Sequence, residues 1–219
     1  MLKKLGIAVL AAIMLGPSLI GIAIALFVSP AGNAACTVAG SGLTVGSVPD
    51  SLQVTTKDGT RFTLNKQQLT HAATIITVGS QVEGVTRDGI QIALMAALTE
   101  SSLRMLSNTG VYPESADYPN DGDASDHDSL GLFQMRPQSG WGTVKELMGP
   151  TYQAQAFFGG PTGPNYPSPR GLLDIPGWQT MSKGEAAQAV EVSAFPDRYA
   201  NYEPVAEPIV VALTTPAPG

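Results

Sequence analysis

Residues 90–103 read IQIALMAALTESSL, an uncharged apolar segment that runs directly into one carboxylate, Glu100. Between residues 90 and 98 only Gln91 is polar, so apolar side chains occur on every side of the expected helix. A helix that is apolar all round is normally buried inside a domain. The sequence therefore predicts a central helix with Glu100 close to its end.

Glu100 itself has two interpretations. A carboxylate beside a buried helix is costly to ionise unless a positive group pairs with it, so we expect its pKa to rise. A carboxyl group that stays protonated near neutral pH can act as a general acid. Arg104 offers the alternative, because it follows Glu100 at the spacing of a surface ion pair on one helix, which would lower the pKa. The segment alone leaves both interpretations open.

The composition excludes several kinds of site. The chain has 219 residues and a formal net charge of −6, and it contains no basic cluster. One domain with extensions is expected, and nucleic acid is not expected as a partner. Cys36 is the only cysteine, so an intrachain disulfide and a cysteine-based metal site are excluded. The chain has two histidines, His71 and His127, too few for a His-rich metal centre, and no cofactor is expected.

The N-terminal segment predicts export. Two lysines precede an apolar run over residues 5–28, which is about 36 Å long as a helix and thus long enough to span a membrane. The next basic residue is Lys57, so the positive-inside rule places the rest of the chain outside. We expect residues 1–36 to be a retained signal anchor. Cleavage near residues 32–34, as in a signal peptide, and lipidation of Cys36 are the alternatives, and all three export the chain.

The remaining chain predicts a mainly α fold with long ordered loops. Residues 37–64 are expected to form a flexible spacer and a small hairpin that turns at Lys57-Asp58-Gly59. The domain proper is expected over residues 65–213, and residues 214–219 read as a disordered tail.

Within that domain, turn and capping signals predict the helices. Asn65 is expected to cap a first helix that ends near Val82, and the central helix is expected to end near Gly110. Later helix starts are indicated by the capping boxes Thr143…Glu146 and Ser182…Glu185 and by Pro150, whose helix is stopped by Gly159. The last helix, over residues 199–213, is expected to be kinked or split by Pro204 and Pro208.

Residues 112–128, YPESADYPNDGDASDHD, must form a loop because they carry six acidic residues, two prolines and no hydrophobic period. The spacing of Asp121, Asp123, Asp126 and Asp128 is similar to that of oxygen-rich calcium loops. The match to an EF-hand fails, because the aspartates do not fall at the ligand positions of that loop and no Glu stands at its last position. A solvated acidic loop and a calcium loop both remain open.

Two motifs together resemble the lysozyme-like lytic transglycosylases. The first is Glu100-Ser101 at the end of an apolar helix, and the second is SLGLFQ at residues 129–134. In this order and spacing the resemblance covers about residues 69–206. The family's third signature, an Ala-Tyr-Asn-Ala-Gly-like turn, is absent, and residues 193–197 read SAFPD in its place.

The resemblance implies a role for each matching residue. Glu100 would be the catalytic acid/base, and Ser101 would lie beside it. The segment from Ser129 to Gln134 would form a wall of the glycan groove, with Gln134 contacting substrate or holding Glu100. Gly131 would let the backbone pass close to a sugar. In place of the missing signature, Phe195 and Tyr199 would supply sugar contacts.

The resemblance also implies a substrate and a reaction. The substrate would be the peptidoglycan glycan strand, cut at the β-1,4 bond between N-acetylmuramic acid and N-acetylglucosamine with formation of a 1,6-anhydro end. A lysozyme-type muramidase with Asp126 or Asp128 as second carboxylate is the alternative within catalysis.

A non-catalytic wall-binding module is the alternative outside catalysis. Its candidate sugar-stacking residues, which are equally candidates for the core, are Trp141, Tyr152, Phe157, Phe158 and Trp178. The expected partners are peptidoglycan, the membrane through residues 5–28, and unidentified envelope-assembly proteins, with the chain in the cell wall outside the membrane.

Overall fold

The computed structural model describes residues 42–193, 195 and 197–216. The predicted anchor over residues 1–36, with its cleavage and lipidation alternatives, lies outside the described residues. None of the helices in the described part of the chain combines the length and hydrophobicity needed to cross a bilayer.

The fold is mixed: α-helices are accompanied by two separate two-stranded antiparallel sheets, where the sequence predicted a mainly α domain with one hairpin. The strands are β1 (Leu43–Val45), β2 (Ser51–Thr55), β3 (Arg61–Asn65) and β4 (Thr214–Pro216). The α-helices are α1 (Lys66–Gln81), α2 (Arg87–Ser101), α3 (Val144–Leu147), α4 (Pro150–Phe158), α5 (Lys183–Glu191), α6 (Asp197–Ala200) and α7 (Glu203–Leu213). Short 3₁₀ helices are η1 (Pro113–Asp117), η2 (Pro137–Ser139), η3 (Leu172–Asp174) and η4 (Trp178–Thr180).

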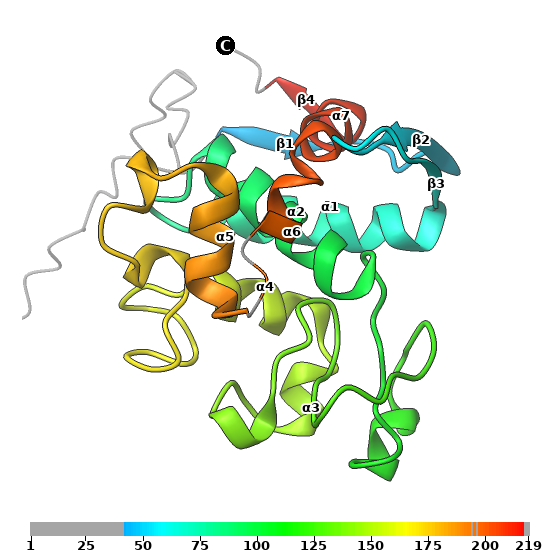
Figure 1. Ribbon diagram of the computed structural model, residues 1–219, viewed down its shortest axis with the longest axis vertical. Helices are drawn as coiled ribbons and strands as arrows, with labels where there is room; N and C mark the ends of the chain where they lie inside the picture. The colour runs from blue at the N-terminus through cyan, green and yellow to red at the C-terminus, as the bar shows by residue number, and fades with distance from the viewer. Residues whose placement is uncertain (1–41, 194, 196, 217–219) are drawn as a thin grey trace, which may run out of the picture. The chain divides into compact units, whose positions relative to one another are not determined.

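Helix α2 is the centre of the fold, as its sequence predicted. Every residue from Gly89 to Leu98 is buried, and the helix packs against α1, α4, α5, α6 and α7. The chain enters it through Thr86, whose side chain accepts a hydrogen bond from the Gly89 N–H at 3.3 Å. In Figure 1 the helix lies among these neighbours rather than on the outside.

The end of α2 differs from the prediction. The helix stops at Ser101 and does not continue to Gly110. Ser102 and Leu103 both take the left-handed conformation, with φ of 57° and 59°, and the Leu103 N–H bonds back to the Ala97 carbonyl at 3.1 Å. The chain therefore turns off the helix axis directly after Glu100, which leaves that residue in the last turn of a buried helix.

The predicted hairpin is confirmed, and a second strand pair was missed. Strands β2 and β3 pair in the register Leu52↔Leu64 and Val54↔Phe62. The predicted flexible spacer contains β1 and the predicted disordered tail contains β4, and these two strands pair as Thr44↔Thr215. Both predictions are wrong at these positions, because each strand is ordered by a partner from the other end of the domain.

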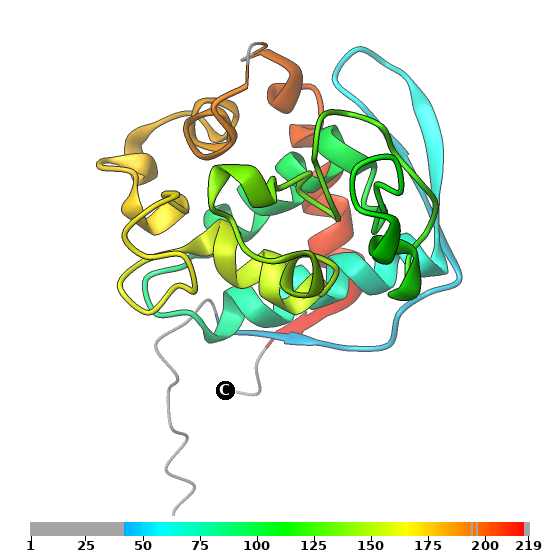
Figure 2. The same ribbon diagram turned by 90° about the horizontal axis from the view of Figure 1, so that it is seen from below.

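The other helix signals behave as expected. Asn65 caps α1 in a capping box with Gln68, and the predicted boxes at Thr143 and Ser182 begin α3 and α5. The last helical region is split into α6 and α7, with Pro208 inside α7. The loop-rich segment that contains η1, η2 and α3 lies below α1 and α2 in Figure 1 and faces the viewer in Figure 2.

Candidate active site

Glu100 is partly buried in the last turn of α2. Its carboxylate lies at the negative end of the helix dipole, which disfavours an anion there. Burial raises the pKa of Glu100 above its ordinary value, opposed by the Tyr199 hydroxyl and the positive charge of Arg198, while the charge of Asp126 adds to the increase. The result matches the first of the two interpretations of Glu100.

Tyr199, on α6, holds the Glu100 carboxylate. The Tyr199 hydroxyl donates a hydrogen bond of 2.5 Å to Glu100 Oε1, within the range of short bonds to a carboxylate. The tyrosine ring is completely buried, and burial, with the nearby carboxylates Glu191 and Glu100, raises the pKa of Tyr199 far above its ordinary value. The hydroxyl therefore keeps its proton and acts as a donor.

Arg104 does not pair with Glu100, so the surface ion-pair interpretation is wrong. The Arg104 backbone N–H bonds to Ser101 Oγ at 3.1 Å, and its Nε bonds to the Ser101 carbonyl at 3.2 Å. Among the described residues Glu100 takes part in none of the ion pairs. The left-handed turn at Ser102 and Leu103 ends the helix before Arg104, so the four-residue helical spacing does not apply.

Ser101 joins the end of α2 to the turn at residues 129–134. Its Oγ lies 2.7 Å from the Leu132 carbonyl and 3.1 Å from the Ala97 carbonyl. The turn is closed by a reciprocal pair of 3.0 Å backbone bonds between Leu130 and Met135. The two segments that the sequence singled out are therefore in direct contact.

The buried residues of the turn make their contacts within the fold. Ser129 is buried, and a Cβ on Gly131 would lie 1.9 Å from Nε2 of Gln153. Gln153 is fully buried, and its side chain accepts from the Phe133 N–H at 2.9 Å and donates to the carbonyls of Leu130 and Leu147. Gly131 thus makes room for Gln153, rather than for a sugar as the resemblance implied.

Gln134 is the predicted site residue of this turn that reaches a cavity. It is partly exposed, has a φ of 49° and donates a 2.9 Å bond to the Gly131 carbonyl. Within the described part of the chain it forms no hydrogen bond with Glu100. The prediction that Gln134 holds Glu100 in place is therefore wrong for this structure. The other predicted role of Gln134, contact with substrate, stays a prediction.

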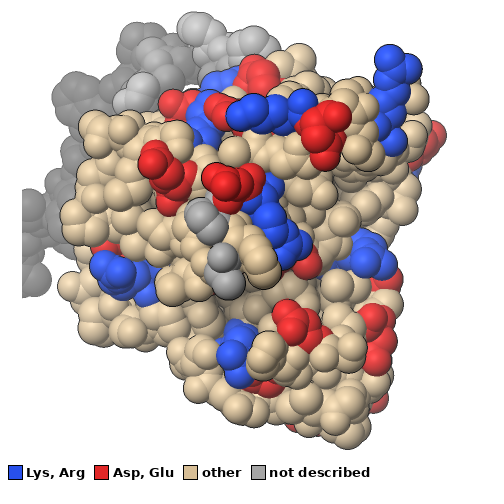
Figure 3. Space-filling view, viewed as in Figure 1, with Lys and Arg blue, Asp and Glu red and all other residues tan. Residues whose placement is uncertain are grey.

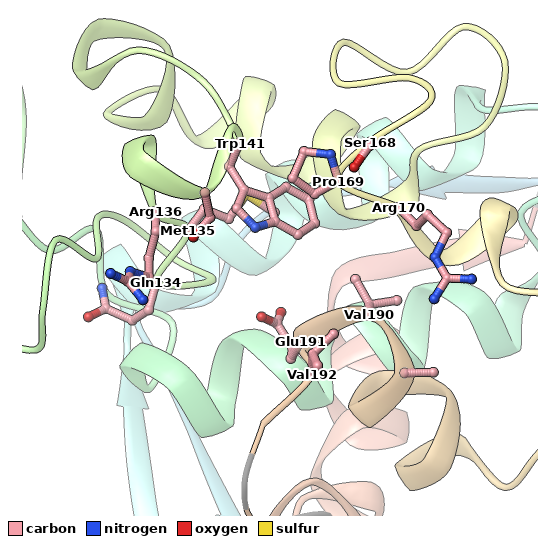
Figure 4. Close-up of a pocket in the computed structure, with 12 residues that line it drawn as sticks. Gln134, Met135, Arg136, Trp141, Ser168, Pro169, Arg170, Val190, Glu191 and Val192 are labelled. Carbon is pink, nitrogen blue, oxygen red and sulfur yellow. The ribbon is translucent and has the colours of Figure 1, made fainter.

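The cavity that Gln134 lines has a volume of about 430 Å³. Figure 4 shows Trp141 and Met135 side by side and Arg170 further along the cavity, while Glu191 comes from the end of α5. Figure 4 shows the Glu191 carboxylate pointing into this space toward the side where the Trp141 indole lies. The cavity therefore combines an aromatic face with charged and amide groups, as ligand sites commonly do.

Glu191 is a residue that the sequence reasoning missed. Its Oε1 is buried and has no hydrogen-bond partner among the described residues. Burial raises the pKa of Glu191 well above its ordinary value, and the charge of Glu100 adds to the increase. Glu191 follows the short segment AAQAV at residues 186–190, but α5 also carries Lys183 and Glu185, so the signal that identified Glu100, one carboxylate ending an apolar helix, is weak here.

Of the two alternatives for the acidic loop, the calcium loop does not match the arrangement of its four aspartates. Asp121 binds His71 at 2.7 Å and the Met105 N–H. Asp123 accepts from the Thr109 N–H and from side chains of Ser107 and Thr109. Asp126 pairs with His127, and Asp128 with Arg136. No three His, Cys, Asp or Glu residues gather as metal ligands in the described chain, because each carboxylate is held by a different donor.

The two candidate second carboxylates differ in environment. Asp128 is 2% exposed and binds the Arg136 guanidinium and the Gln138 N–H. Burial raises the pKa of Asp128, but these two partners outweigh it and hold the pKa below its ordinary value. Asp126 is exposed, and its charge acts on Glu100. Of the two, Asp126 is the carboxylate available to a ligand near Glu100.

The remaining predicted residues separate into surface and core. Phe195 is 62% exposed with the Arg198 guanidinium 5.8 Å from its ring centre, and Tyr199 offers its hydroxyl to Glu100 rather than its ring to a sugar. Of the aromatic residues considered for sugar stacking, Phe157, Phe158 and Trp178 are buried core residues. Tyr152 packs partly buried with its hydroxyl on the Trp141 carbonyl, which leaves Trp141 at the cavity.

Surface charge and comparisons with known proteins complete the description. On the face shown in Figure 3, acidic and basic side chains are interspersed and form no single basic patch.

No protein-family model and no curated protein matches the chain. Function is therefore inferred from the residues around Glu100 and the neighbouring cavity.

Proposed function

We propose that this chain is a peptidoglycan lytic transglycosylase built on a lysozyme-like helical domain, with Glu100 as its acid/base. The observation that supports it is the position of Glu100: a partly buried carboxyl group with a raised pKa, free of Arg104, at the end of the central helix. The bond between Ser101 and Leu132 ties this group to the SLGLFQ turn, so the two motifs of the resemblance are neighbours in space.

The proposed reaction begins with proton transfer from Glu100 to the oxygen of the β-1,4 bond between N-acetylmuramic acid and N-acetylglucosamine. The bond breaks, positive charge develops on the muramyl ring, and Glu100 becomes a carboxylate. It then accepts the proton of the muramyl C6 hydroxyl, whose oxygen attacks the anomeric carbon and forms the 1,6-anhydro ring. Water is not consumed and Glu100 recovers its proton. One carboxyl group suffices because the nucleophile belongs to the substrate, whereas a hydrolase ordinarily needs two.

Tyr199 has a defined part in this cycle. Its hydroxyl donates to Glu100 Oε1 and keeps its proton. A donor of this kind stabilises the carboxylate that forms after the first proton transfer more than it stabilises the neutral acid. It also fixes the carboxyl orientation, so that the same group is in place for the second proton transfer.

The cavity that Gln134 lines suits a sugar, although Glu100 is not itself among its lining residues. Trp141 offers an aromatic face, Gln134 an amide and Glu191 a carboxyl group, within a volume of about 430 Å³. Apolar and aromatic walls with a few polar groups are usual for small-molecule sites. Export through residues 5–28, attachment to the membrane and contacts with envelope-assembly proteins belong to this proposal as the context in which such an enzyme would meet its substrate.

A lysozyme-type muramidase is the second candidate, and one observation favours it. Asp126 is exposed and close enough for its charge to raise the pKa of Glu100. It could therefore activate a water molecule on a sugar bound at Glu100. Asp128 is less suited, because Arg136 and the Gln138 N–H already occupy its carboxylate.

The test is digestion of purified peptidoglycan by the exported part of the chain, with mass spectrometry of the fragments. Under the proposal the fragments carry 1,6-anhydro ends, each lighter by one water molecule than a reducing end. Glu100→Gln is expected to reduce the rate by at least ~10²-fold, the usual contribution of a general acid. Glu83→Gln, an exposed residue before α2, removes the same charge and serves as the control.

Each other outcome has a definite meaning. Reducing ends, together with loss of activity in Asp126→Asn, would replace the lyase by the muramidase. Unchanged turnover in Glu100→Gln would exclude catalysis at this residue. Binding of the wall without any fragments would leave the non-catalytic module, for which Trp141 is the remaining cavity aromatic.

A further inference from the structure

The turn of the β2–β3 hairpin binds one residue of the segment that carries Tyr199. The Lys57 N–H donates to the Asn201 carbonyl at 2.9 Å. The Asp58 N–H donates to Asn201 Oδ1 at 3.1 Å, and Asn201 Nδ2 donates to Asp58 Oδ2 at 3.2 Å. In Figure 2 the cyan hairpin loop and the orange helix α6 come together at the top of the view. The Asn201 amide is therefore bound at both of its ends by one residue of the hairpin.

The hairpin side of this contact is itself held in place. Oδ1 of Asp58 accepts hydrogen bonds from the Thr56 hydroxyl and from the Thr60 N–H, the latter at 3.0 Å. These bonds lower the pKa of Asp58 to about 2, with the Thr56 hydroxyl as the largest cause. Asp58 is therefore ionised at every pH at which the protein would be assayed, and its Oδ2 remains an acceptor for the Asn201 amide.

Helix α6 is too short to fix its own position. It has four residues, Asp197–Ala200, whereas isolated helices need about 12–15 residues to be even marginally stable in water. It leads directly into Asn201, whose N–H bonds to the Arg198 carbonyl at 3.3 Å. The next residue, Tyr202, packs edge-on against Phe62 of β3 with ring centres 6.3 Å apart. The hairpin thus contacts the C-terminal end of α6 through two successive residues.

The position of α6 matters for Glu100, because α6 carries both groups that favour its ionised form. The Tyr199 hydroxyl donates to Glu100 Oε1 at 2.5 Å, and the positive charge of Arg198 acts in the same direction. A hydrogen bond weakens steeply when its length and angle depart from their preferred values. A small displacement of α6 would therefore weaken both effects at once.

We propose that Asp58 and Asn201 are positioning residues of the Glu100 site. The hairpin turn fixes Asn201, Asn201 fixes the end of α6, and α6 holds the Tyr199 hydroxyl against the Glu100 carboxylate. The hairpin precedes the helical part of the domain in sequence, yet it is a working part of the site. This inference rests on the proposed function only for its consequence for peptidoglycan cleavage.

The other contacts of α6 define the alternative. The Tyr199 ring is completely buried, and α5 approaches α6 so closely that a Cβ on Gly184 would lie 3.1 Å from that of Ala200. If this packing alone placed the Tyr199 hydroxyl, the hairpin would contribute to stability and not to the site. The two cases differ in what happens to Glu100 when the contact between Asp58 and Asn201 is broken.

The charged groups around Glu100 stay unchanged in the test. Arg198 and Asp126 act on Glu100 with opposite signs, and burial and the charge of Glu100 raise the pKa of Glu191. The other charged side chains on α2, α5 and α6 are Arg87, Asp88, Lys183, Glu185 and Asp197. None of these groups is substituted, so a change in the pKa of Glu100 reports on the position of α6.

The experiment breaks the contact and then restores it in reverse. Asn201→Asp removes the amide donor and places a second carboxylate against that of Asp58. The double substitution Asp58→Asn with Asn201→Asp returns one amide and one carboxylate to the contact, with the donor now on residue 58. Asp58→Ala, at an exposed turn residue, is a second way of breaking it should Asn201→Asp fail to fold. Gln53→Glu, at an exposed position of β2, adds a charge to the same hairpin and is the control.

Two measurements follow Glu100. Side-chain carboxyl ¹³C NMR of the full-length chain gives its pKa, and the signal is assigned by its absence in Glu100→Gln. We expect this pKa to rise by about half a pH unit or more in Asn201→Asp and in Asp58→Ala, because the groups that lower it recede. The alkaline limb of peptidoglycan cleavage should move up by the same amount, and the reversed pair should bring both values back toward the wild type. Loss of the Asp58 charge would by itself lower the pKa, so a rise in Asp58→Ala has the opposite sign to a direct charge effect.

The remaining outcomes count against the inference. A pKa of Glu100 that stays at the wild-type value or falls in the folded single variants would overturn it, because packing alone would then place Tyr199. A reversed pair that shifts the pKa as far as Asn201→Asp does would overturn it too. If the wild type does not cleave peptidoglycan but the pKa moves as expected, the proposed function fails and the positioning role stands. If the wild type cleaves and the pKa does not move, only the positioning role fails.

Discussion

Ser101 Oγ and the Leu132 carbonyl oxygen lie 2.7 Å apart, and this contact connects the last turn of α2 with the turn at residues 129–134. Both groups are buried, so neither can turn to water for a replacement partner. Ser101 Oγ also accepts the Arg104 N–H, and thereby fixes the direction in which the chain leaves α2. The position of Glu100 therefore depends on its neighbour in sequence.

We predict that Ser101→Ala lowers the free energy of unfolding by about 1–3 kcal/mol, since it leaves the buried Leu132 carbonyl without its partner. The Arg104 N–H loses one of its two acceptors and keeps the Ser101 carbonyl at 3.2 Å. Urea denaturation followed by circular dichroism measures the loss. Ser80→Ala is the matched control, because its hydroxyl also bonds to a carbonyl, that of Thr77, but on an exposed surface. The prediction fails if both substitutions have the same small effect.

Tyr199→Phe is expected to move the alkaline limb of the pH–rate profile to higher pH. The hydrogen bond from Tyr199 lowers the pKa of Glu100, so its removal lets burial raise that pKa further. Activity measured from acidic to alkaline pH checks it. Tyr202→Phe is the control, because Tyr202 packs its ring edge-on against Phe62, away from Glu100. A limb that stays in place or moves down in Tyr199→Phe would contradict the assignment.

Gly131→Ala is expected to be far more destabilising than Gly59→Ala. Both glycines have positive φ, 74° and 88°, so both substitutions introduce backbone strain, of order 1–3 kcal/mol. A Cβ at residue 59 meets open space, whereas one at residue 131 would overlap the buried Gln153 amide. Crowding of a packed core typically costs a further ~1–3 kcal/mol. The midpoints of thermal or urea unfolding of the two variants give the difference directly, and equal midpoints would show that residue 131 is not tightly packed.

The stability of the protein is expected to depend on pH through the two carboxyl groups whose pKa burial raises, Glu100 and Glu191. Burial raises the pKa of both Glu100 and Glu191 above the ordinary 4.5. Their contribution to stability is therefore complete below pH 4.5 and is lost as the pH rises through the folded-state pKa values. Glu191→Gln removes one of these groups, so we expect this variant to gain stability relative to the wild type as the pH increases. Urea denaturation at several pH values measures the difference, which should be constant with pH for Glu83→Gln.

Local signals predicted the parts of the fold that local physics determines. The apolar segment at residues 90–98 predicted the buried helix, and Asn65, Thr143 and Ser182 predicted helix starts, because a cap satisfies backbone groups within a few residues. The β2–β3 hairpin followed from a turn sequence between two strand-like segments. Each of these features depends on neighbours in the sequence.

The features that were missed depend on residues far apart. Strands β1 and β4 are each too short to be recognised alone, and they exist because of their pairing across the whole domain. The end of α2 was misplaced because Ser102 and Leu103 take the left-handed conformation, which a sequence normally signals with glycine. Here the conformation accompanies the burial of Leu103 in the core, which depends on residues far from it in the sequence.

The site shows the same division. Glu100 was predicted from its own helix, and its contact with the SLGLFQ turn agrees with the pairing of the two motifs. Its partner Tyr199 comes from α6 and the cavity residue Glu191 from α5, and no local pattern connects them with α2. The function of Gly131 was misjudged because Gln153, the side chain that it accommodates, lies on a different helix.

The pairing of β1 with β4 has a mechanical consequence. Leu43 begins β1 and lies opposite Pro216, which ends β4. The chain therefore enters β1 and leaves β4 at the same end of the strand pair. A force that pulls the two flanking segments apart would load the rungs one after another and unzip them, instead of shearing all of them together. The β1–β4 pairing thus offers little resistance to tension applied at this end of the domain, because only one rung at a time opposes it.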